Sequence, residues 1–327
     1  MPEQTFIEAI RGALADEMAA DARVIVLGED VAVKGGVFLA TDGLLARFGA
    51  RRVIDMPVAE IAVAGVAIGA SLHGLRPVAE IQFADYLHPA IDQIINEAAK
   101  FRYRSAGEWS CPIVVRAPFG SGVHGGLYHS QSSEALFTST PGLKVVIPST
   151  PYDAKGLLIA AIRDPDPVIF FEHKQLYRSV RGDVPAGCYT VPIGLAAVRR
   201  PGSDLSLFTY GLMAHHSLAA AEQVAAEGID VEVIDLRTLY PLDTQTILDS
   251  VRKTGKALVV HEDNLTGGVG GEIAALIAEH AFESLDGPVR RLASPDVPAT
   301  AFNEDLEAHY MLNPEKIAEA IRELAGY

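Results

Sequence analysis

Two hydrophobic patterns alternate along the first half of the chain. Short runs of almost wholly apolar residues are followed by longer segments in which apolar residues recur every three or four positions. Runs of the first kind are typical of strands buried on both faces of a parallel sheet, and segments of the second kind are typical of helices. The alternation predicts a doubly wound α/β domain, whose expected strands are 24–27, 53–54, 77–82, 112–116, 143–148 and 168–171.

Local signals mark where the helices of this domain begin. Thr5 is placed to cap a helix that carries Phe6 and Ile10 on one apolar stripe. Pro151 suits the first position of a helix that runs to residue 162. A long helix is expected after Tyr86, because apolar residues recur at helical spacing between residues 91 and 98.

The alternation begins again after a segment at 182–187 that contains glycine and proline. Strands are expected at 205–209, 231–236 and 257–260, and helices at 215–227, 247–251 and 271–282. The sequence therefore predicts two doubly wound α/β domains, at 1–181 and 201–327, joined by a linker at 182–200.

The stretch 55–74 contains the most informative carboxylate of the chain. A helix is expected to begin at Pro57, which would put Glu60 in the first turn, near the positive end of the helix dipole. Small residues dominate the rest of this helix, which indicates that it is buried, and no Lys or Arg lies between Arg52 and Arg76. Glu60 is either a dipole partner or a carboxylate that needs a ligand, a hydrogen-bond donor or a proton.

Two other positions invite a functional interpretation. Glu29 follows the expected strand 24–27, and ligands gather at the carboxyl ends of strands in open α/β sheets. Tyr86 lies at a strand-to-helix junction. From the residues alone, Glu29 is equally compatible with an ordinary loop, and an isolated tyrosine at such a junction is more often a core residue than a stacking partner.

A glycine-rich segment at 119–131 carries two histidines, His124 and His129. It matches neither GxGxxG followed by an acid nor GxxxxGK[ST], and it has no lysine, so the pattern gives little support to a phosphate-binding loop. A metal site through the two histidines has no third ligand of the usual kind nearby.

Composition and charge narrow the class of protein. The chain has 327 residues, of which 49% are hydrophobic, enough for two cores. Its 27 Lys and Arg against 42 Asp and Glu give a net charge of −15, which argues against a nucleic-acid partner. The first 21 residues read as an amphipathic helix rather than a signal peptide, no apolar run could span a membrane, and Cys111 and Cys188 form no CxxC pair. We therefore expect a protein of the reducing cytoplasm.

Residues 55–60, which read DMPVAE, their small-residue helix and GLRP at 74–77 resemble the beta subunit of the thiamine-diphosphate-dependent component of 2-oxo acid dehydrogenase complexes. The resemblance runs the length of the chain and implies a pyrimidine-binding domain followed by a transketolase-type C-terminal domain. It implies that Glu60 grips a ring nitrogen of the cofactor's aminopyrimidine, that Glu29 lies near the cofactor, and that Tyr86 stacks on the ring. It also implies oxidative decarboxylation of a 2-oxo acid, with transfer of the acyl group to lipoamide.

The segment around the histidines refines this resemblance. HGGLYHSQ at 124–131, followed by EALF at 134–137, resembles the branched-chain (2-oxoisovalerate) version of the family most. His129 matches the active-site histidine of that family, which implies that it orients the substrate or donates a proton during acyl transfer. The preferred 2-oxo acid stays open at this point, with pyruvate and acetoin dehydrogenase beta subunits as alternatives.

The missing cofactor-binding motifs imply a partner. Enzymes of this kind hold the diphosphate through Mg²⁺ with Gly-Asp-Gly and a downstream Asn pair, but here Gly182-Asp183 is followed by Val184 and there is no Asn-Asn. The resemblance therefore implies an alpha subunit that holds the Mg²⁺, an α2β2 heterotetramer, and a lipoyl domain of the acyltransferase component as acyl acceptor. It further implies a structural monovalent cation such as K⁺ on the backbone carbonyls of Ile113, Val114, Ala161, Asp164 and Asp166.

An alternative of a different class is a non-catalytic α/β scaffold or a nucleotide-binding subunit. GGVGG at 267–271 stands before an expected helix, a position that suits anion binding. The resembled family uses its C-terminal domain mainly for subunit contacts, which favours the dehydrogenase interpretation over nucleotide binding.

Overall fold

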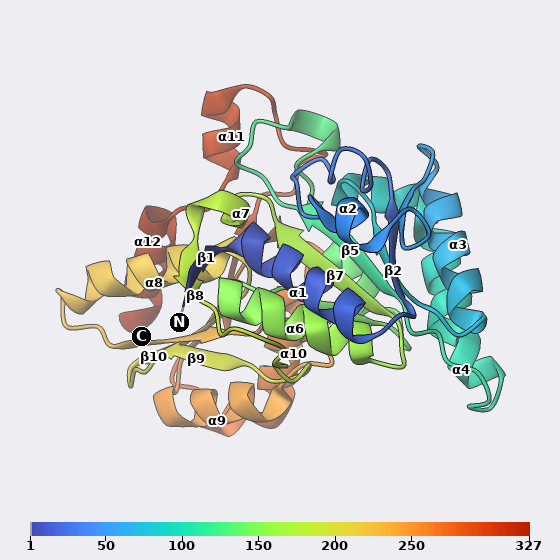
Figure 1. Cartoon of the computed structure of the whole chain (residues 1–327). Helices are drawn as coiled ribbons and strands as arrows, with labels where there is room; N and C mark the ends of the chain where they lie inside the picture. Colours follow the sequence, from blue (N-terminus) through green and yellow to red (C-terminus); the bar gives the residue numbers. More distant parts are fainter. Residues whose placement is uncertain (1) are drawn as a thin grey trace. The chain divides into compact units, whose positions relative to one another are not determined.

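The computed structural model describes residues 2–327 and contains two compact units (Figure 1). The first unit comprises the residues up to Phe119 together with Leu136–Ile193, and the second comprises Gly120–Ala135 and Gly194–Tyr327. Gly120–Ala135 thus belongs to the second unit, whereas the sequence-based division placed it in the domain 1–181. The boundaries 1–181, 182–200 and 201–327 remain a proposal.

The first unit is built on a parallel sheet in which six of its strands run in the order β6-β7-β5-β4-β2-β3. The chain leaves β2 to form β3 on one side and then β4 on the other, so the winding direction reverses at β2. All six strands lie where the apolar runs predicted them, with ends shifted by a few residues. Their bounds are β2 (Val24–Gly28), β3 (Val53–Asp55), β4 (Arg76–Glu80), β5 (Val114–Phe119), β6 (Lys144–Val146) and β7 (Val168–His173).

Helices α1 (Phe6–Ala20) and α6 (Pro151–Arg163) pack side by side in the first unit (Figure 1). Thr5 caps α1 as predicted and forms a capping box with Glu8. Lys155 on α6 bonds Asp16 on α1 at 2.8 Å. The remaining regular elements of this unit are β1 (Glu3–Thr5), its antiparallel partner β8 (Arg181–Asp183), α2 (Leu44–Phe48) and α7 (Leu176–Ser179).

The helix with Glu60 differs from the prediction at its start and in its burial. Helix α3 (Glu60–Leu72) begins at Glu60, not at Pro57. The reason is that the Met56 N–H bonds the Gly28 carbonyl at 2.8 Å and keeps the chain extended beside β2 past the end of β3. Only one face of α3 is buried, and Ile61 and Val66 are 49% and 47% exposed.

The predicted long helix after Tyr86 is a series of short helical pieces. Two 3₁₀ segments, η1 (Ala84–Ala90) and η3 (Ala98–Lys100), flank a π-helical segment, η2 (Gln93–Glu97), and α4 (Phe101–Arg104) follows. Pro89 has no N–H for the Asp85 carbonyl, and the His88 Nδ1 atom lies 2.8 Å from that carbonyl instead. A regular α-helix therefore does not form across this turn.

The second unit contains a five-stranded sheet in the order β14-β13-β10-β11-β9, parallel except for β9. Its strands are β9 (Ala197–Arg200), β10 (Leu205–Thr209), β11 (Val231–Asp235), β13 (Ala257–Asn264) and β14 (Arg290–Ser294). Three of these match predicted strands, while β9 and β14 carry too few apolar residues to be recognised. Its helices are α8 (Leu212–Ala225), α9 (Thr244–Thr254), α10 (Gly270–His280), α11 (Glu304–Tyr310) and α12 (Pro314–Ala325), and shorter elements of the chain are η4 (Gly126–Tyr128), α5 (Glu134–Thr138), β12 (Thr238–Tyr240) and η5 (Phe282–Ser284). Among residues 2–327, no helix is both long and apolar enough to cross a membrane.

A buried ion triad links the strands in the middle of the first sheet. The Arg116 guanidinium on β5 donates to Glu172 on β7 at 2.6 and 2.7 Å and to Glu80 on β4 at 2.5 Å. The Tyr177 hydroxyl donates to Glu172 at 2.6 Å. All three charged side chains are at most 2% exposed. Burial and the charge of Glu172 raise the pKa of Glu80, and Arg116 opposes this shift.

We expect Arg116→Met to destabilise the protein by about 3–5 kcal/mol, because it removes the cation from between two buried carboxylates. Denaturant unfolding of the variant and the wild type measures this difference. Arg23→Met, which breaks the exposed pair with Asp21, is the matched control and should change the free energy of unfolding far less. An equal decrease in the free energy of unfolding in the two variants would contradict a special role for the triad.

Candidate functional site

Three residues highlighted by the sequence analysis follow the carboxyl ends of neighbouring strands, and these ends form what is here termed the sheet edge. Glu29 follows β2, Glu60 begins the helix after β3, and Tyr86 lies in η1 after β4. These strands are parallel neighbours whose ends are level, since Gly28 pairs with Asp55 on one side and with Glu80 on the other. The winding reverses at this point, where open α/β sheets bind ligands outside the carboxyl ends of their strands.

Glu29 is a buried carboxylate that lacks part of its hydrogen bonding. It is 7% exposed, and its Oε1 atom has no hydrogen-bond partner among the described residues. Burial raises its pKa, the charges of Glu60 and Asp30 raise it further, and the Ala59 backbone N–H opposes the shift. A donor from a ligand would satisfy this oxygen, because an unpaired buried acceptor is costly.

Tyr86 is half-buried beside the same carboxylates. Burial raises the pKa of its hydroxyl, and the charges of Asp85, Glu60 and Glu29 add to the shift. The Tyr86 ring meets the Phe83 ring at a centroid distance of 6.0 Å and an interplanar angle of 87°. This edge-to-face contact is a favoured geometry for a pair of aromatic rings.

Gln82 is a neighbour that the sequence analysis did not single out. Its Nε2 atom donates to the Glu29 backbone carbonyl at 3.4 Å, and the side chain is half-buried. Its position two residues after the end of β4 is the signal that could have identified it. The edge therefore offers two carboxylates, an amide and an aromatic ring, which suits a nitrogen-rich aromatic ligand.

His129 lies in the second unit, on the segment Gly120–Ala135, here termed the histidine loop. It follows η4, and its backbone N–H points to the Gly126 carbonyl at 3.5 Å. His124 has a positive φ of 54°, and its Nδ1 atom lies 2.5 Å from Glu307. Residues 2–327 contain no group of three or more His, Cys, Asp or Glu that could hold a metal ion.

The backbone carbonyls expected to bind a monovalent cation already have donors at three positions. The Ile113 carbonyl accepts from the Val168 N–H at 3.0 Å, and the Ala161 carbonyl accepts from the Asp164 N–H at 3.2 Å. The Asp164 carbonyl accepts from the Arg76 guanidinium at 3.2 Å. The positive charge of Arg76 would repel a cation there. The cation site, which also includes Val114 and Asp166, stays a prediction.

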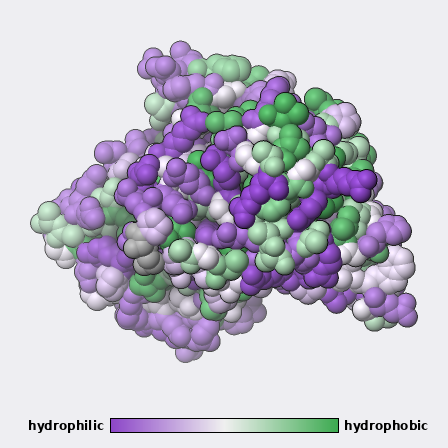
Figure 2. Space-filling view, viewed as in Figure 1, coloured by the Kyte–Doolittle hydropathy of each residue, from purple (hydrophilic) through white to green (hydrophobic). Residues whose placement is uncertain are grey.

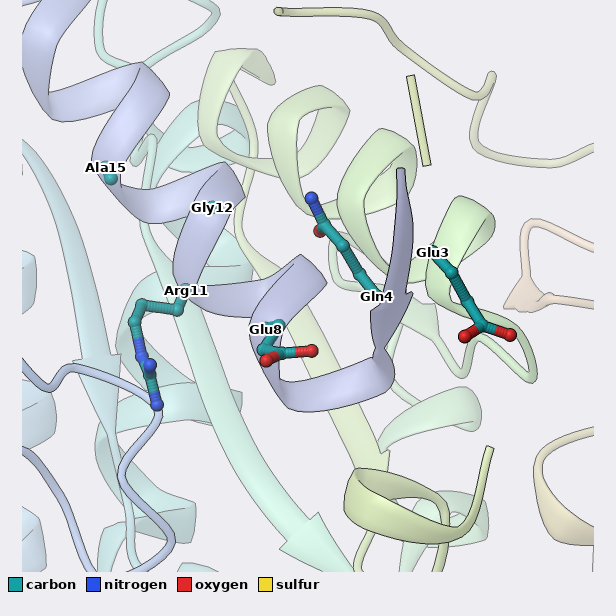
Figure 3. Close-up of a pocket in the computed structure, with 6 residues that line it drawn as sticks. All are labelled: Glu3, Gln4, Glu8, Arg11, Gly12 and Ala15. Carbon is teal, nitrogen blue, oxygen red and sulfur yellow. The ribbon is translucent and has the colours of Figure 1, made fainter. Parts of the chain in front are cut away.

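A surface hollow of about 360 Å³ is lined by other residues, which belong to β1 and α1 (Figure 3). Its charged side chains have structural partners, since Glu8 closes the capping box with Thr5 and Arg11 donates to the Leu39 carbonyl at 3.1 Å. Gln4, Gly12 and Ala15 also line it. We therefore assign the candidate site to the sheet edge and not to this hollow.

Comparison with known proteins identifies both units. Residues 3–180 match the model of the transketolase pyrimidine-binding domain, and residues 194–317 match that of the transketolase C-terminal domain. The 2-oxoisovalerate dehydrogenase subunit beta of Bacillus subtilis is 57% identical over 327 residues, which cover 100% of both chains. The corresponding subunit of Pseudomonas aeruginosa is 45% identical over 334 residues, covering 97% of this chain and 94% of the relative. This chain belongs to the family of 2-oxo acid dehydrogenase beta subunits.

Two further matches place this beta subunit within the family. The pyruvate dehydrogenase E1 component subunit beta of Bacillus subtilis is 49% identical over 328 residues, which cover 100% of both chains. A solved split-gene transketolase, described as an inactive β4 tetramer, matches with a TM-score of 0.80 at 25% identity, covering 98% of each chain. The family implies the use of thiamine diphosphate and association with an alpha subunit.

The sheet edge of the beta subunit fits the aminopyrimidine end of this cofactor. The unpaired Oε1 atom of Glu29 can accept a hydrogen bond, and Glu60 lies close enough for its charge to raise the pKa of Glu29. Tyr86 offers an aromatic face in the same place. The assignment of individual roles to Glu29, Glu60, Tyr86 and His129 remains a proposal.

A second set of buried acids lies inside the second unit of the beta subunit. Glu134, at the end of the histidine loop, is 0% exposed and accepts a hydrogen bond from the Tyr210 hydroxyl at 2.7 Å. Burial, followed by the charge of Asp263, raises the pKa of Glu134 to about 8. Burial also raises the pKa of Asp263 to about 6. Glu134 therefore holds a proton in the folded protein well above the pH at which it ionises in the unfolded chain.

This shift predicts that Glu134 weakens the protein as the pH rises. The pKa of Glu134 in the folded protein lies above the unfolded value of 4.5. The stabilising effect of its proton is therefore complete below pH 4.5 and is lost as the pH rises through about 8. Glu134→Gln has no proton to lose and keeps an acceptor for Tyr210. The stability difference between wild type and Glu134→Gln should therefore change by a few kcal/mol, to order of magnitude, between pH 5 and 8.

Denaturant unfolding across this pH range tests the prediction. Glu279→Gln, at an exposed position in the same unit, is the matched control, and its free energy of unfolding should change with pH as that of the wild type does. A Glu134→Gln curve that also runs parallel to the wild type would show that Glu134 does not hold its proton in this way.

Proposed function

We propose that this chain is the beta subunit of a branched-chain 2-oxo acid dehydrogenase, which decarboxylates 2-oxoisovalerate and related acids and passes the acyl group to lipoamide. The observation that carries this proposal is the 57% identity to a 2-oxoisovalerate dehydrogenase beta subunit, against 49% to a pyruvate dehydrogenase beta subunit of the same organism. The segment HGGLYHSQ at 124–131 supports the same choice.

Bound thiamine diphosphate supplies the carbon nucleophile and the electron sink for decarboxylation. In our proposal, Glu60 exchanges a proton with a ring nitrogen of the aminopyrimidine, and Tyr86 packs against the face of that ring. Glu29 accepts a hydrogen bond through its unpaired oxygen. The half-buried surroundings strengthen this proton sharing, because hydrogen bonds are electrostatically stronger away from bulk water.

His129 acts in a later step of the proposed reaction. It orients the substrate or donates a proton as the acyl group moves to the dithiolane of a lipoyl domain, which belongs to the acyltransferase component. An imidazole suits such a step because it gains and loses a proton near neutral pH. The proposed site of action is the cytoplasm.

The alpha subunit completes the proposed site and holds the Mg²⁺ and the diphosphate. In this chain, apolar side chains flank Glu60 at the surface, with Val58 82%, Ile61 49% and Val66 47% exposed. Figure 2 shows hydrophobic atoms mixed with hydrophilic ones over the part of the first unit that contains α3. Exposed apolar side chains of this kind support burial by a partner, and we propose an α2β2 heterotetramer.

A pyruvate dehydrogenase beta subunit is the second candidate, supported by the 49% identity over the whole chain. The charge effects between Glu29, Glu60 and Tyr86 favour either dehydrogenase over a non-catalytic scaffold, because a scaffold has no use for neighbouring carboxylates at the carboxyl ends of its strands.

The first test concerns the proton transfer. In the tetramer, Glu60→Gln should slow deuterium exchange at the thiazolium carbon of bound cofactor by about 10²–10⁴-fold, because the amide cannot exchange a proton with the ring. The near-isosteric change should leave assembly and cofactor binding intact. Glu3→Gln, at an exposed site on β1, is the control and should exchange at the wild-type rate.

Glu29→Gln distinguishes the two carboxylates of the site. The rate of deuterium exchange should fall less in this variant than in Glu60→Gln, because Glu29 only accepts a hydrogen bond in the proposed mechanism. Wild-type exchange in Glu60→Gln, together with slow exchange in Glu29→Gln, would show that the proton transfer belongs to Glu29.

The second test concerns the substrate. The reconstituted tetramer should have a higher kcat/KM for 2-oxoisovalerate than for pyruvate, because the histidine segment resembles the branched-chain type. Parallel assays with both acids and a lipoyl domain measure the ratio. A preference for pyruvate would favour the second candidate.

A further inference from the structure

Helix α11 holds one end of the histidine loop through a single carboxylate. The Gly122 N–H donates to Oε1 of Glu307 at 2.8 Å, and Nδ1 of His124 lies 2.5 Å from Oε2. Glu307 is 2% exposed, although three of the five other residues at 304–309 are charged or polar and all five are exposed. Figure 1 shows α11 beside the loop. Both carboxylate oxygens of this buried side chain therefore contact the loop.

A second carboxylate, Glu262 near the end of β13, binds the base of the loop. Its Oε1 atom accepts the Ser121 N–H, and the Glu262 side chain is 3% exposed. The Ser121 hydroxyl donates to the Ser130 carbonyl at 3.0 Å, which ties the start of the loop to the residue that follows His129. The Gly120 N–H donates to the Gln131 carbonyl at 3.1 Å and closes the base of the loop.

Close packing inside the loop couples the backbone position of His124 to that of His129. A Cβ atom added at Gly125 would lie 2.8 Å from the His129 Cβ atom and 2.9 Å from the His129 carbonyl oxygen. His124, the residue before Gly125, has a φ of 54° and is kept in this strained conformation next to Glu307. A shift of His124 would therefore move the backbone around His129.

We propose that Glu307 and Glu262 are positioning residues for His129, which they hold by binding the first arm of the histidine loop at Ser121, Gly122 and His124. The inference rests on the proposed function, since it assumes that His129 acts in acyl transfer. Hydrogen bonds to a carboxylate are stronger than those between neutral groups, which suits them to fixing a glycine-rich segment. A displacement of 1 Å at a reacting group can lower a rate by about 10²-fold.

The proposal predicts a defect confined to the later step of the reaction. Glu307→Gln replaces the carboxylate with a neutral amide, so the contacts to Gly122 and His124 become at best weaker, neutral hydrogen bonds. In the reconstituted tetramer, acylation of the lipoyl domain should slow by about 10-fold to 10²-fold. Deuterium exchange at the thiazolium carbon, which depends on Glu60, should stay at the wild-type rate.

Two further variants make the test decisive. Glu304→Gln makes the same chemical change at an exposed position of α11 and should leave both rates unchanged. His124→Asn removes the Glu307 contact from the exposed side, and asparagine tolerates a positive φ. It should slow acylation as Glu307→Gln does, and it decides the question if Glu307→Gln does not fold.

His129→Asn, measured in parallel, separates the failure of this inference from that of the proposed function. If His129→Asn slows acylation while Glu307→Gln and His124→Asn do not, the positioning role is wrong and the role of His129 stands. If His129→Asn acylates at the wild-type rate, the assigned role of His129 is wrong, and the positioning role falls with it. Equal slowing of exchange and acylation in Glu307→Gln would also overturn the proposal.

Discussion

The ion triad in the first sheet is the constraint on which the site edge depends. Arg116 binds Glu80 at the last position of β4, so the strand that leads to Gln82 and Tyr86 is fixed to its neighbours where it ends. Glu172 is shared between Arg116 and the Tyr177 hydroxyl. From Tyr177, ring contacts run through Phe38 and Phe83 to Tyr86, at centroid distances of 5.1, 5.6 and 6.0 Å. The buried charges and the proposed stacking ring thus belong to one connected core.

The buried carboxylates of this protein lie in three different kinds of surroundings. Glu80 and Glu172 are paired with Arg116, and Glu134 is kept protonated by burial and by a neighbouring acid. Glu29, like Glu134, has a raised pKa and an oxygen without a hydrogen-bond partner among the described residues, but it lies at the carboxyl ends of the strands, where the winding reverses. Because ligands bind at such positions in open α/β sheets, Glu29 is the carboxylate that indicates a ligand.

The features that could be predicted from the sequence are those that depend on local pattern. The six strands of the first sheet follow from apolar runs, as does the place of Glu29 at a strand end, and the place of Glu60 in the first turn of a helix follows from the proline before it. The irregular helix after β4 and the start of α3 at Glu60 depend on single contacts, at the Asp85 carbonyl and the Met56 N–H. The attachment of the histidine loop to the second unit depends on Glu262 and Glu307, which lie more than 130 residues further along the chain. No local periodicity carries that information.

The attachment of the histidine loop has a consequence for how such subunits can diversify. The loop is encoded within the first half of the gene, whereas the side chains that hold it are encoded in the second half. A recombination event near residue 190 would therefore join a loop from one parent to anchoring residues from another. In such a hybrid the loop keeps both anchors only where the second parent also carries Glu262 and Glu307.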